Sequence, residues 1–161
     1  MLRLFRGAVL ALMMAPTAGA AQDFDAGVAA ANAEDFATAL REWRPLAERG
    51  NAAAQRNLGL MYNTGKGVSQ DETEAVKWFR LAAEQGESSA QSNLGIMYAD
   101  GECVPQDYVT AHMWLNLAAA NGSDVAPKRR DLVAQSMTPA DISEAQRRAR
   151  VCIASGYQDC D

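Results

Sequence analysis

The stretch Ala54-Gln-Arg-Asn-Leu-Gly-Leu-Met-Tyr62 returns as Ala90-Gln-Ser-Asn-Leu-Gly-Ile-Met-Tyr98, 36 residues further along the chain. The same offset continues without a gap through matched pairs of residues: Gly65 and Gly101, Val68 and Val104, Trp78 and Trp114, Ala82 and Ala118, Gly86 and Gly122. An internal period of this length is typical of stacked helical repeats. Residues 39–50 match residues 75–86 in part. The sequence therefore contains two full units, 51–86 and 87–122, preceded by a half unit, 23–50.

Each unit is predicted to form two short helices. Over residues 52–63, the positions of Ala54, Leu58 and Met61 fall on one helix face. The second helix is expected to run from a cap at Asp71 to about residue 85, followed by a glycine that favours a left-handed end. Helix pairs of this kind bury their apolar faces by stacking on neighbours, so the sequence predicts an all-α fold, an α/α solenoid.

One glycine recurs inside the first helix of each unit, at Gly59 and Gly95. Glycine destabilises a helix interior by up to about 1 kcal/mol relative to alanine. Its repetition at one position predicts that a neighbouring backbone passes close by.

The pattern A-x-x-x-L-G-x-M-Y-x-x-G-x-G-V-x-x-D-x-x-x-A-x-x-W-x-x-x-A-A-x-x-G, from Ala54 to Gly86, resembles the Sel-1-like repeat, a relative of the tetratricopeptide repeat. The unit from Ala90 to Gly122 departs from it at one place, where Cys103 replaces the glycine found at Gly67. The resemblance implies an α/α superhelix with an adaptor or scaffold role. Some cysteine-rich exported members bind or hydrolyse penicillin-like compounds, so the resemblance also leaves a β-lactam-binding or amide-hydrolysing enzyme as an alternative.

Both ends of the array are expected to carry capping helices. Residues 23–33 are predicted to be the first helix of the half unit, and residues 123–156 to form two capping helices before a tail at 157–161. Thr138 and Pro139 are typical of a helix start, and this last helix is expected to run antiparallel to the helix over 123–136. The charged run Lys128–Asp131 suits an outer cap and favours a monomer.

The first 20 residues have the features of a cleavable signal peptide. Arg3 and Arg6 precede an apolar run over 7–15, and Ala18-Gly-Ala20 provides the small residues of a cleavage site after Ala20. The run is shorter than the roughly 20 residues that span a bilayer. We therefore expect a periplasmic or secreted domain, 21–161, with no stable membrane insertion after cleavage.

Charge and cysteine content limit the partners and the compartment. Without residues 1–20, 13 basic residues face 20 acidic ones, a net charge of −7 that makes nucleic acid an improbable partner. Cys152 and Cys160 are predicted to form a disulfide through a turn containing Gly156, unless Cys152 is simply a small core residue. Cys103 is expected to be the free thiol, because it should lie roughly 20 Å from Cys152.

The sequence contains no recognisable catalytic or metal-binding motif. Its single histidine, His112, aligns with Val76 and Leu40 and is expected to pack against the helices, with no second histidine to complete a metal site. Gly-x-Ser-x-Gly and Ser-x-x-Lys motifs are absent. Cys103 with His112 is the one remaining nucleophile and base pair, and no third group is evident to orient it. We expect no catalytic residue, no cofactor and no metal.

The expected function is to hold another protein or a peptide. Aromatic residues that repeat with the unit are assigned to the core, and the binding candidates are polar residues beside the apolar stripe of the first helices: Arg56, Asn57, Asn63, Ser92 and Asn93. Such helices usually line the concave side of a solenoid. The recurring Asn57 and Asn93 fit either a hydrogen-bonded ladder between units, which we favour, or a clamp on a peptide backbone.

Overall fold

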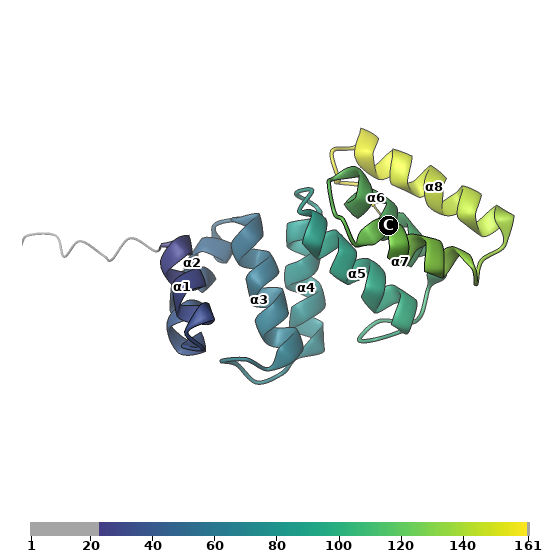
Figure 1. Ribbon diagram of the computed structural model, residues 1–161. Coiled ribbons are helices and arrows are strands. Elements are labelled where there is room, and N and C mark those ends of the chain that lie inside the picture. The colour runs from purple at the N-terminus through teal and green to yellow at the C-terminus, as the bar shows by residue number, and fades with distance from the viewer. Residues whose placement is uncertain (1–22, 161) are drawn as a thin grey trace, which may run out of the picture.

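The computed structural model describes residues 23–160, and the elements of this part are all helices. The helices are, in chain order, α1 (Phe24–Asn32), α2 (Phe36–Glu48), α3 (Ala52–Thr64), α4 (Glu72–Ala83), α5 (Ser88–Asp100), α6 (Tyr108–Ala120), α7 (Ala126–Ala134) and α8 (Pro139–Ala154). They form an elongated array with α1 at one end and α8 at the other (Figure 1). The proposed signal peptide lies outside the described residues.

Neighbours in the chain are neighbours in space from α1 to α7. Each helix packs on the next, both within a pair and between pairs. This is the expected α/α solenoid, and the prediction of an all-α fold is confirmed. Within residues 23–160, no helix combines the length and the apolar character that crossing a bilayer requires.

The two full repeats begin and end their helices in the same way. The side chains of Asp71 and Asp107 accept backbone N–H groups at the starts of α4 and α6. Gly65 and Gly101 end α3 and α5 in the left-handed conformation, with φ of 68° and 71°. Local signals in the sequence therefore fix these boundaries.

The leading unit is a complete helix pair with a shorter connection. Trp43 of the leading unit corresponds to Phe79, 36 residues further on, but Gly27 corresponds to Gly59, only 32 residues further on. The link between α1 and α2 is therefore four residues shorter than the link between the two helices of a full repeat. Gly27 receives the Trp43 ring as Gly59 receives the ring of Phe79.

The space that these helical glycines leave is filled by side chains. A Cβ on Gly59 would lie 2.6 Å from the Phe79 ring, and one on Gly95 would lie 2.6 Å from Leu115 Cγ. The Ala111 carbonyl oxygen, a backbone atom, would lie 3.1 Å from the same Cβ on Gly95. The expectation of a passing backbone was therefore wrong at Gly59, because a large side chain from the paired helix takes the place instead.

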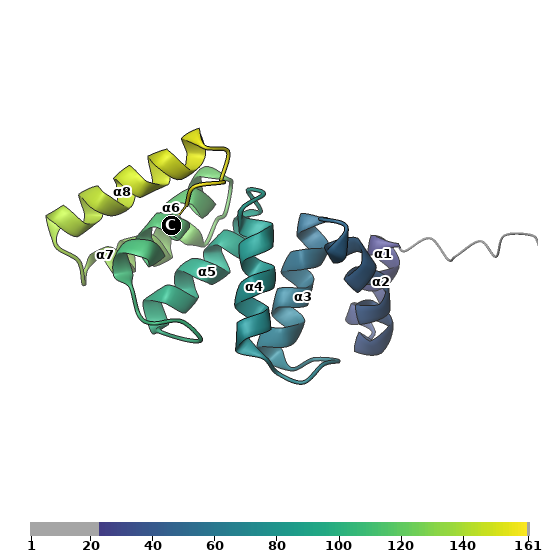
Figure 2. The ribbon, with the colours of Figure 1, turned by 180° about the vertical axis from the view of Figure 1, so that it is seen from behind.

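The last helix packs differently from the prediction. α8 lies on α6 and makes few contacts with α7, and α7 is shorter than the expected helix over 123–136. Ala145, Ala149 and Cys152 form the buried stripe of α8 and join the core that contains Trp114. These small residues let α8 approach α6 closely, so α8 crosses the end of the array as a lid (Figures 1 and 2).

Candidate binding face

An amide ladder joins successive units, and glutamines build it. Gln55 Nε2 donates to the Ala47 carbonyl oxygen at 3.0 Å, while its Oε1 accepts from Gln85 at 2.7 Å. Gln91 repeats the rung, donating to the Ala83 carbonyl at 3.0 Å and accepting from Asn121 at 2.9 Å. The favoured ladder of Asn57 and Asn93 was therefore wrong. The glutamine two residues before each asparagine is the side chain that reaches a free carbonyl group at the C-terminal end of the second helix of the preceding unit.

Arg56 and Ser92 contact the following unit. Arg56 Nε lies 3.6 Å from Glu87 Oε1, and the Ser92 and Ser123 hydroxyl oxygens lie 3.0 Å apart at the equivalent positions one unit on. Ser92 is only 4% exposed. The structure thus places both residues at junctions between units, and Ser92 was wrongly expected at an accessible surface.

The three asparagine candidates have different surroundings. Asn57 is buried, yet its carboxamide forms no hydrogen bond with any residue of 23–160. Asn93, its counterpart, is half-buried. Asn63 is also half-buried, and its carbonyl oxygen accepts from Gln70 Nε2 at 3.0 Å, which holds the connector after α3. Of the five candidates, Asn57 is a buried residue whose carboxamide has no hydrogen-bond partner within residues 23–160, and Arg56 Nε is a buried atom that also lacks one there.

A row of apolar side chains was missed by the sequence analysis. Leu60, Ile96 and Leu132 occupy the same position in α3, α5 and α7, each 36 residues from the next. Leu60 is 37% exposed and Leu132 57%, and Ile96 is half-buried. The sequence could have revealed these residues, because they repeat at intervals of 36. They lie next to the apolar helix face that was assigned to the core, and so they were not recognised as a separate surface. We call these three residues the apolar row.

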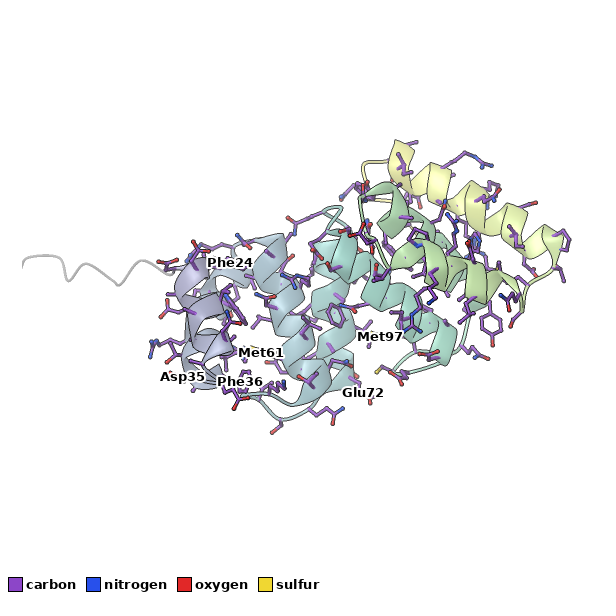
Figure 3. The ribbon with its side chains drawn as sticks, viewed as in Figure 1. Phe24, Asp35, Phe36, Met61, Glu72 and Met97 are labelled. Atoms are coloured by element: carbon purple, nitrogen blue, oxygen red, sulfur yellow. A yellow bond between two sulfur atoms is a disulfide. The ribbon has the colours of Figure 1, made fainter. Side chains whose placement is uncertain are left out.

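Several grooves touch this row, one of about 480 Å³ beside Leu132, and two of the others lie at equivalent places. The first, of about 280 Å³, lies between the leading pair and α3 and includes Trp43, Asn57 and Leu60. The second, of about 60 Å³, includes Leu115, Arg129 and Leu132, which stand 72 residues further on. Figure 3 shows Phe36 at the start of α2 and Met61 near the end of α3, and both residues line the first groove.

The repeated aromatic residues are structural. Trp78 and Trp114 are buried in the core. The hydroxyl groups of Tyr62 and Tyr98 each accept a hydrogen bond, from Arg44 and Arg80 respectively, at 2.9 Å. The aromatic positions therefore serve packing between units, as the sequence predicted.

The cysteines separate into one pair and one thiol. Cys152 and Cys160 form a disulfide, with Cα atoms 4.5 Å apart. Cys103 is free and half-buried in the connector before α6. Burial, followed by the neighbouring Glu72 and Glu102 carboxylates, raises the pKa of the Cys103 thiol to about 12. A thiol that stays protonated at neutral pH is a poor nucleophile.

His112 is a core residue of α6. Its ring is buried, and Nδ1 has no hydrogen-bond partner in the described part of the chain. Burial, together with the charge of Arg130, lowers the pKa of the imidazole, so the neutral form is favoured. Residues 23–160 hold no group of three or more side chains placed to bind a metal ion.

Comparison with known proteins identifies the repeat. The family model described as Sel1 repeat matches residues 52–87 and 88–123. The chain is 38% identical to the Sel1 repeat protein from Oxalobacter formigenes, over 67% of this chain and 84% of that chain, with a TM-score of 0.61. The chain belongs to the Sel1 repeat family. No curated protein matches this Sel1 repeat chain.

A second solved structure extends the likeness over more of the chain. It is c5321, described as a protective antigen present in uropathogenic Escherichia coli strains and displaying an SLR fold. The identity is 32% and the TM-score 0.76, over 81% of this chain but only 30% of c5321. The present chain thus spans under a third of that protein.

Proposed function

We propose that this Sel1 repeat protein is an exported scaffold that holds a segment of another protein on the exposed face of α3, α5 and α7. The apolar row carries the proposal. Leu60, Ile96 and Leu132 keep apolar surface in contact with water at the same position of three successive units. A contiguous apolar surface rimmed by polar groups is typical of an interaction site.

A location in the periplasm or outside the cell fits the covalent structure. The disulfide between Cys152 and Cys160 is favoured in an oxidising compartment. The first 20 residues have the features of an export signal, and the remaining chain is acidic. We propose that the protein acts there as a monomer, with α8 covering the end of the array.

We further propose that binding proceeds without catalysis, cofactor or metal. A cysteine hydrolase needs a thiolate and a base that can take a proton. The pKa of Cys103 is about 12, and His112 is buried away from solvent. These properties argue against the β-lactam or amide hydrolase that the family resemblance leaves as an alternative.

Capture of partners from the cell envelope tests the scaffold. The bait is residues 21–161, compared with a Leu60→Ser, Ile96→Ser and Leu132→Ser variant of the apolar row. The matched control replaces three exposed apolar residues elsewhere: Leu81, Val151 and Ile153. We expect the row variant to lose specific partners that the control retains, while circular dichroism shows both folded. An unchanged set of partners in the row variant would contradict the proposal.

The absence of catalysis has its own assay. Purified protein is expected not to hydrolyse nitrocefin. Turnover that disappears in His112→Ala or Cys103→Ser would overturn the non-catalytic proposal.

A further inference from the structure

The groove between the leading helix pair and the first repeat has mostly apolar walls. Phe36 and Trp43 come from α2, and Leu60 and Met61 come from α3. The volume of about 280 Å³ lies just below the roughly 300–1,000 Å³ of sites that enclose a whole small molecule. It matches one bulky side chain. A helix about 10 Å across would not enter it.

The groove is particular to this junction. Gly67 of the connector after α3 packs directly on Phe36, where the next unit has Glu72. Trp43 is turned toward α1, and its indole N–H donates to the Phe24 carbonyl oxygen at 3.2 Å. The equivalent groove two units on has only about 60 Å³. The size of the groove at this junction therefore follows from residues of the leading pair and not from the repeat pattern.

Asn57 provides the observation that points to a ligand. Its side chain lines the groove, only 7% of the residue is exposed, and no group of residues 23–160 bonds to its carboxamide. The carboxamide keeps contact with solvent through the groove, unlike the fully buried and unpaired Nδ1 of His112. Gln55, two residues earlier on the same helix, has both ends of its amide bonded within the protein. A polar group entering the groove would satisfy Asn57.

Lys66 supplies charge at the rim. Its Nζ lies 5.4 Å from the centroid of the Phe36 ring, and the side chain is exposed. Lys66 forms no ion pair with the described residues. In a chain with an excess of acidic residues, this unpaired cation next to an apolar groove favours an anionic group on the occupant.

We propose that this groove anchors one bulky apolar residue of an extended partner segment that carries a carboxylate beside the anchor. Asn57 bonds the main-chain amide of the anchor residue, and Lys66 pairs with the carboxylate. This inference rests on the proposed function and specifies its partner as an acidic–apolar peptide segment.

A small probe with the same three groups tests the site. N-acetyl-L-phenylalanine has an aromatic ring, an amide and a carboxylate. Titrated into ¹⁵N-labelled residues 21–161, it should shift NMR signals of the groove, including the Trp43 indole and the Asn57 carboxamide. N-acetylglycine, which lacks the ring, should cause no such shifts. N-acetyl-L-phenylalanine amide should bind about threefold to fivefold more weakly, as expected for loss of an exposed ion pair.

Two variants and their matched controls sharpen the test. Asn57→Leu keeps the size of the side chain and should weaken probe binding about fivefold, as expected for one lost hydrogen bond. Asn93→Leu, at the same position of the next repeat, should change probe binding little. Lys66→Ala should reduce the acid probe to the affinity of its amide, whereas Lys77→Ala on α4 should not.

The outcomes separate this inference from the scaffold proposal. Probe binding that is unchanged in both Asn57→Leu and Lys66→Ala, shifts elsewhere on the chain, or no shifts up to about 10 mM probe would each overturn it. If the apolar-row variant loses envelope partners but Lys66→Ala keeps them, the groove proposal fails and the scaffold stands. Probe binding in the groove without any captured partner supports the groove and counts against the scaffold.

Discussion

The two repeats share one backbone course but differ at one connector position. Gly67 has φ of 74°, and Cys103, its counterpart, has φ of 66°. A Cβ on Gly67 would lie 2.6 Å from the Phe36 Cβ and 3.0 Å from the Phe36 carbonyl oxygen. In the second repeat the counterpart of Phe36 is Glu72, and the side chain of Cys103 is accommodated beside it. Both connectors adopt the left-handed conformation at this position. Whether a side chain fits there depends on the residue that the preceding unit places beside it.

The grooves at the first and last junctions of the array also differ in residues that do not repeat. At the first junction, Asn57 lines a space of about 280 Å³. At the corresponding place in the last junction, Arg129 lines a space of about 60 Å³, and it also lines a separate groove of about 480 Å³ with Asp124, Val125 and Lys128. Repetition of the sequence thus reproduces the helices, while residues that do not repeat determine where a ligand can enter.

Substitutions at Gly67 and Cys103, the corresponding positions of the two connectors, should cause the largest change in the free energy of unfolding. Gly67→Ala is expected to lower the free energy of unfolding by about 3 kcal/mol, because it combines left-handed strain with a clash against the Phe36 backbone. Cys103→Gly is expected to raise it by up to about 1 kcal/mol by relieving the strain. Urea unfolding measures both.

Cys103→Ala serves as the control for this exchange. It keeps the strained Cβ and removes only the thiol, so it should not reproduce the gain from Cys103→Gly. A loss from Gly67→Ala no larger than the gain from Cys103→Gly would show that the neighbouring unit has no part in the difference.

The disulfide holds its loop against the second repeat and against Gly86 at the end of the first repeat. Its loop holds Tyr157, whose hydroxyl donates to Asn121 Oδ1 at 3.0 Å and so extends the rung from Gln91. Cys160→Ser should therefore cost about 2–3 kcal/mol, the value expected for opening a small loop. Backbone hydrogen exchange should become faster near Asn121 and remain unchanged near Gln55. Cys103→Ser is the control, and equal acceleration in both repeats would contradict the expectation.

The sequence alone predicted the helix boundaries where the residues that determine them act locally. Asp71 and Asp107 cap their helices as predicted, and Gly65 and Gly101 end theirs, because these effects act within one turn of the chain. The position of α8 was not predictable in this way. It depends on which surface the other helices leave uncovered, and a helix pattern does not contain that information.

The candidate site shows the same limit at the scale of single residues. Gln55 and Asn57 both lie on α3, but only the longer side chain bridges to the preceding unit. That leaves Asn57 facing a groove whose walls come from α2 and α3. Its walls include Phe36 and Trp43 of the leading pair, so spacing within the repeat could not reveal it.

The smallest expected effect is a pH dependence confined to the second repeat. His112 stands where the first repeat has Val76, and burial, with the Arg130 charge, lowers the pKa of the folded imidazole below its usual 6.5, against a smaller opposing effect of Asp131. Below pH 6.5 the unfolded chain takes up a proton that the folded chain resists. The free energy of unfolding should therefore fall as the pH drops from 6.5 toward the lowered value, by at most about 1.4 kcal/mol per pH unit.

His112→Val isolates this contribution, because it gives the second repeat the residue of the first. The difference in unfolding free energy between wild type and variant should change between pH 6.5 and pH 5 and be constant from pH 7 to pH 8. The lowered carboxylate pKa values of Asp107 and Glu144 act at more acidic pH and are common to both proteins. Parallel pH profiles would show that the buried ring is protonated as readily in the folded chain as in the unfolded one.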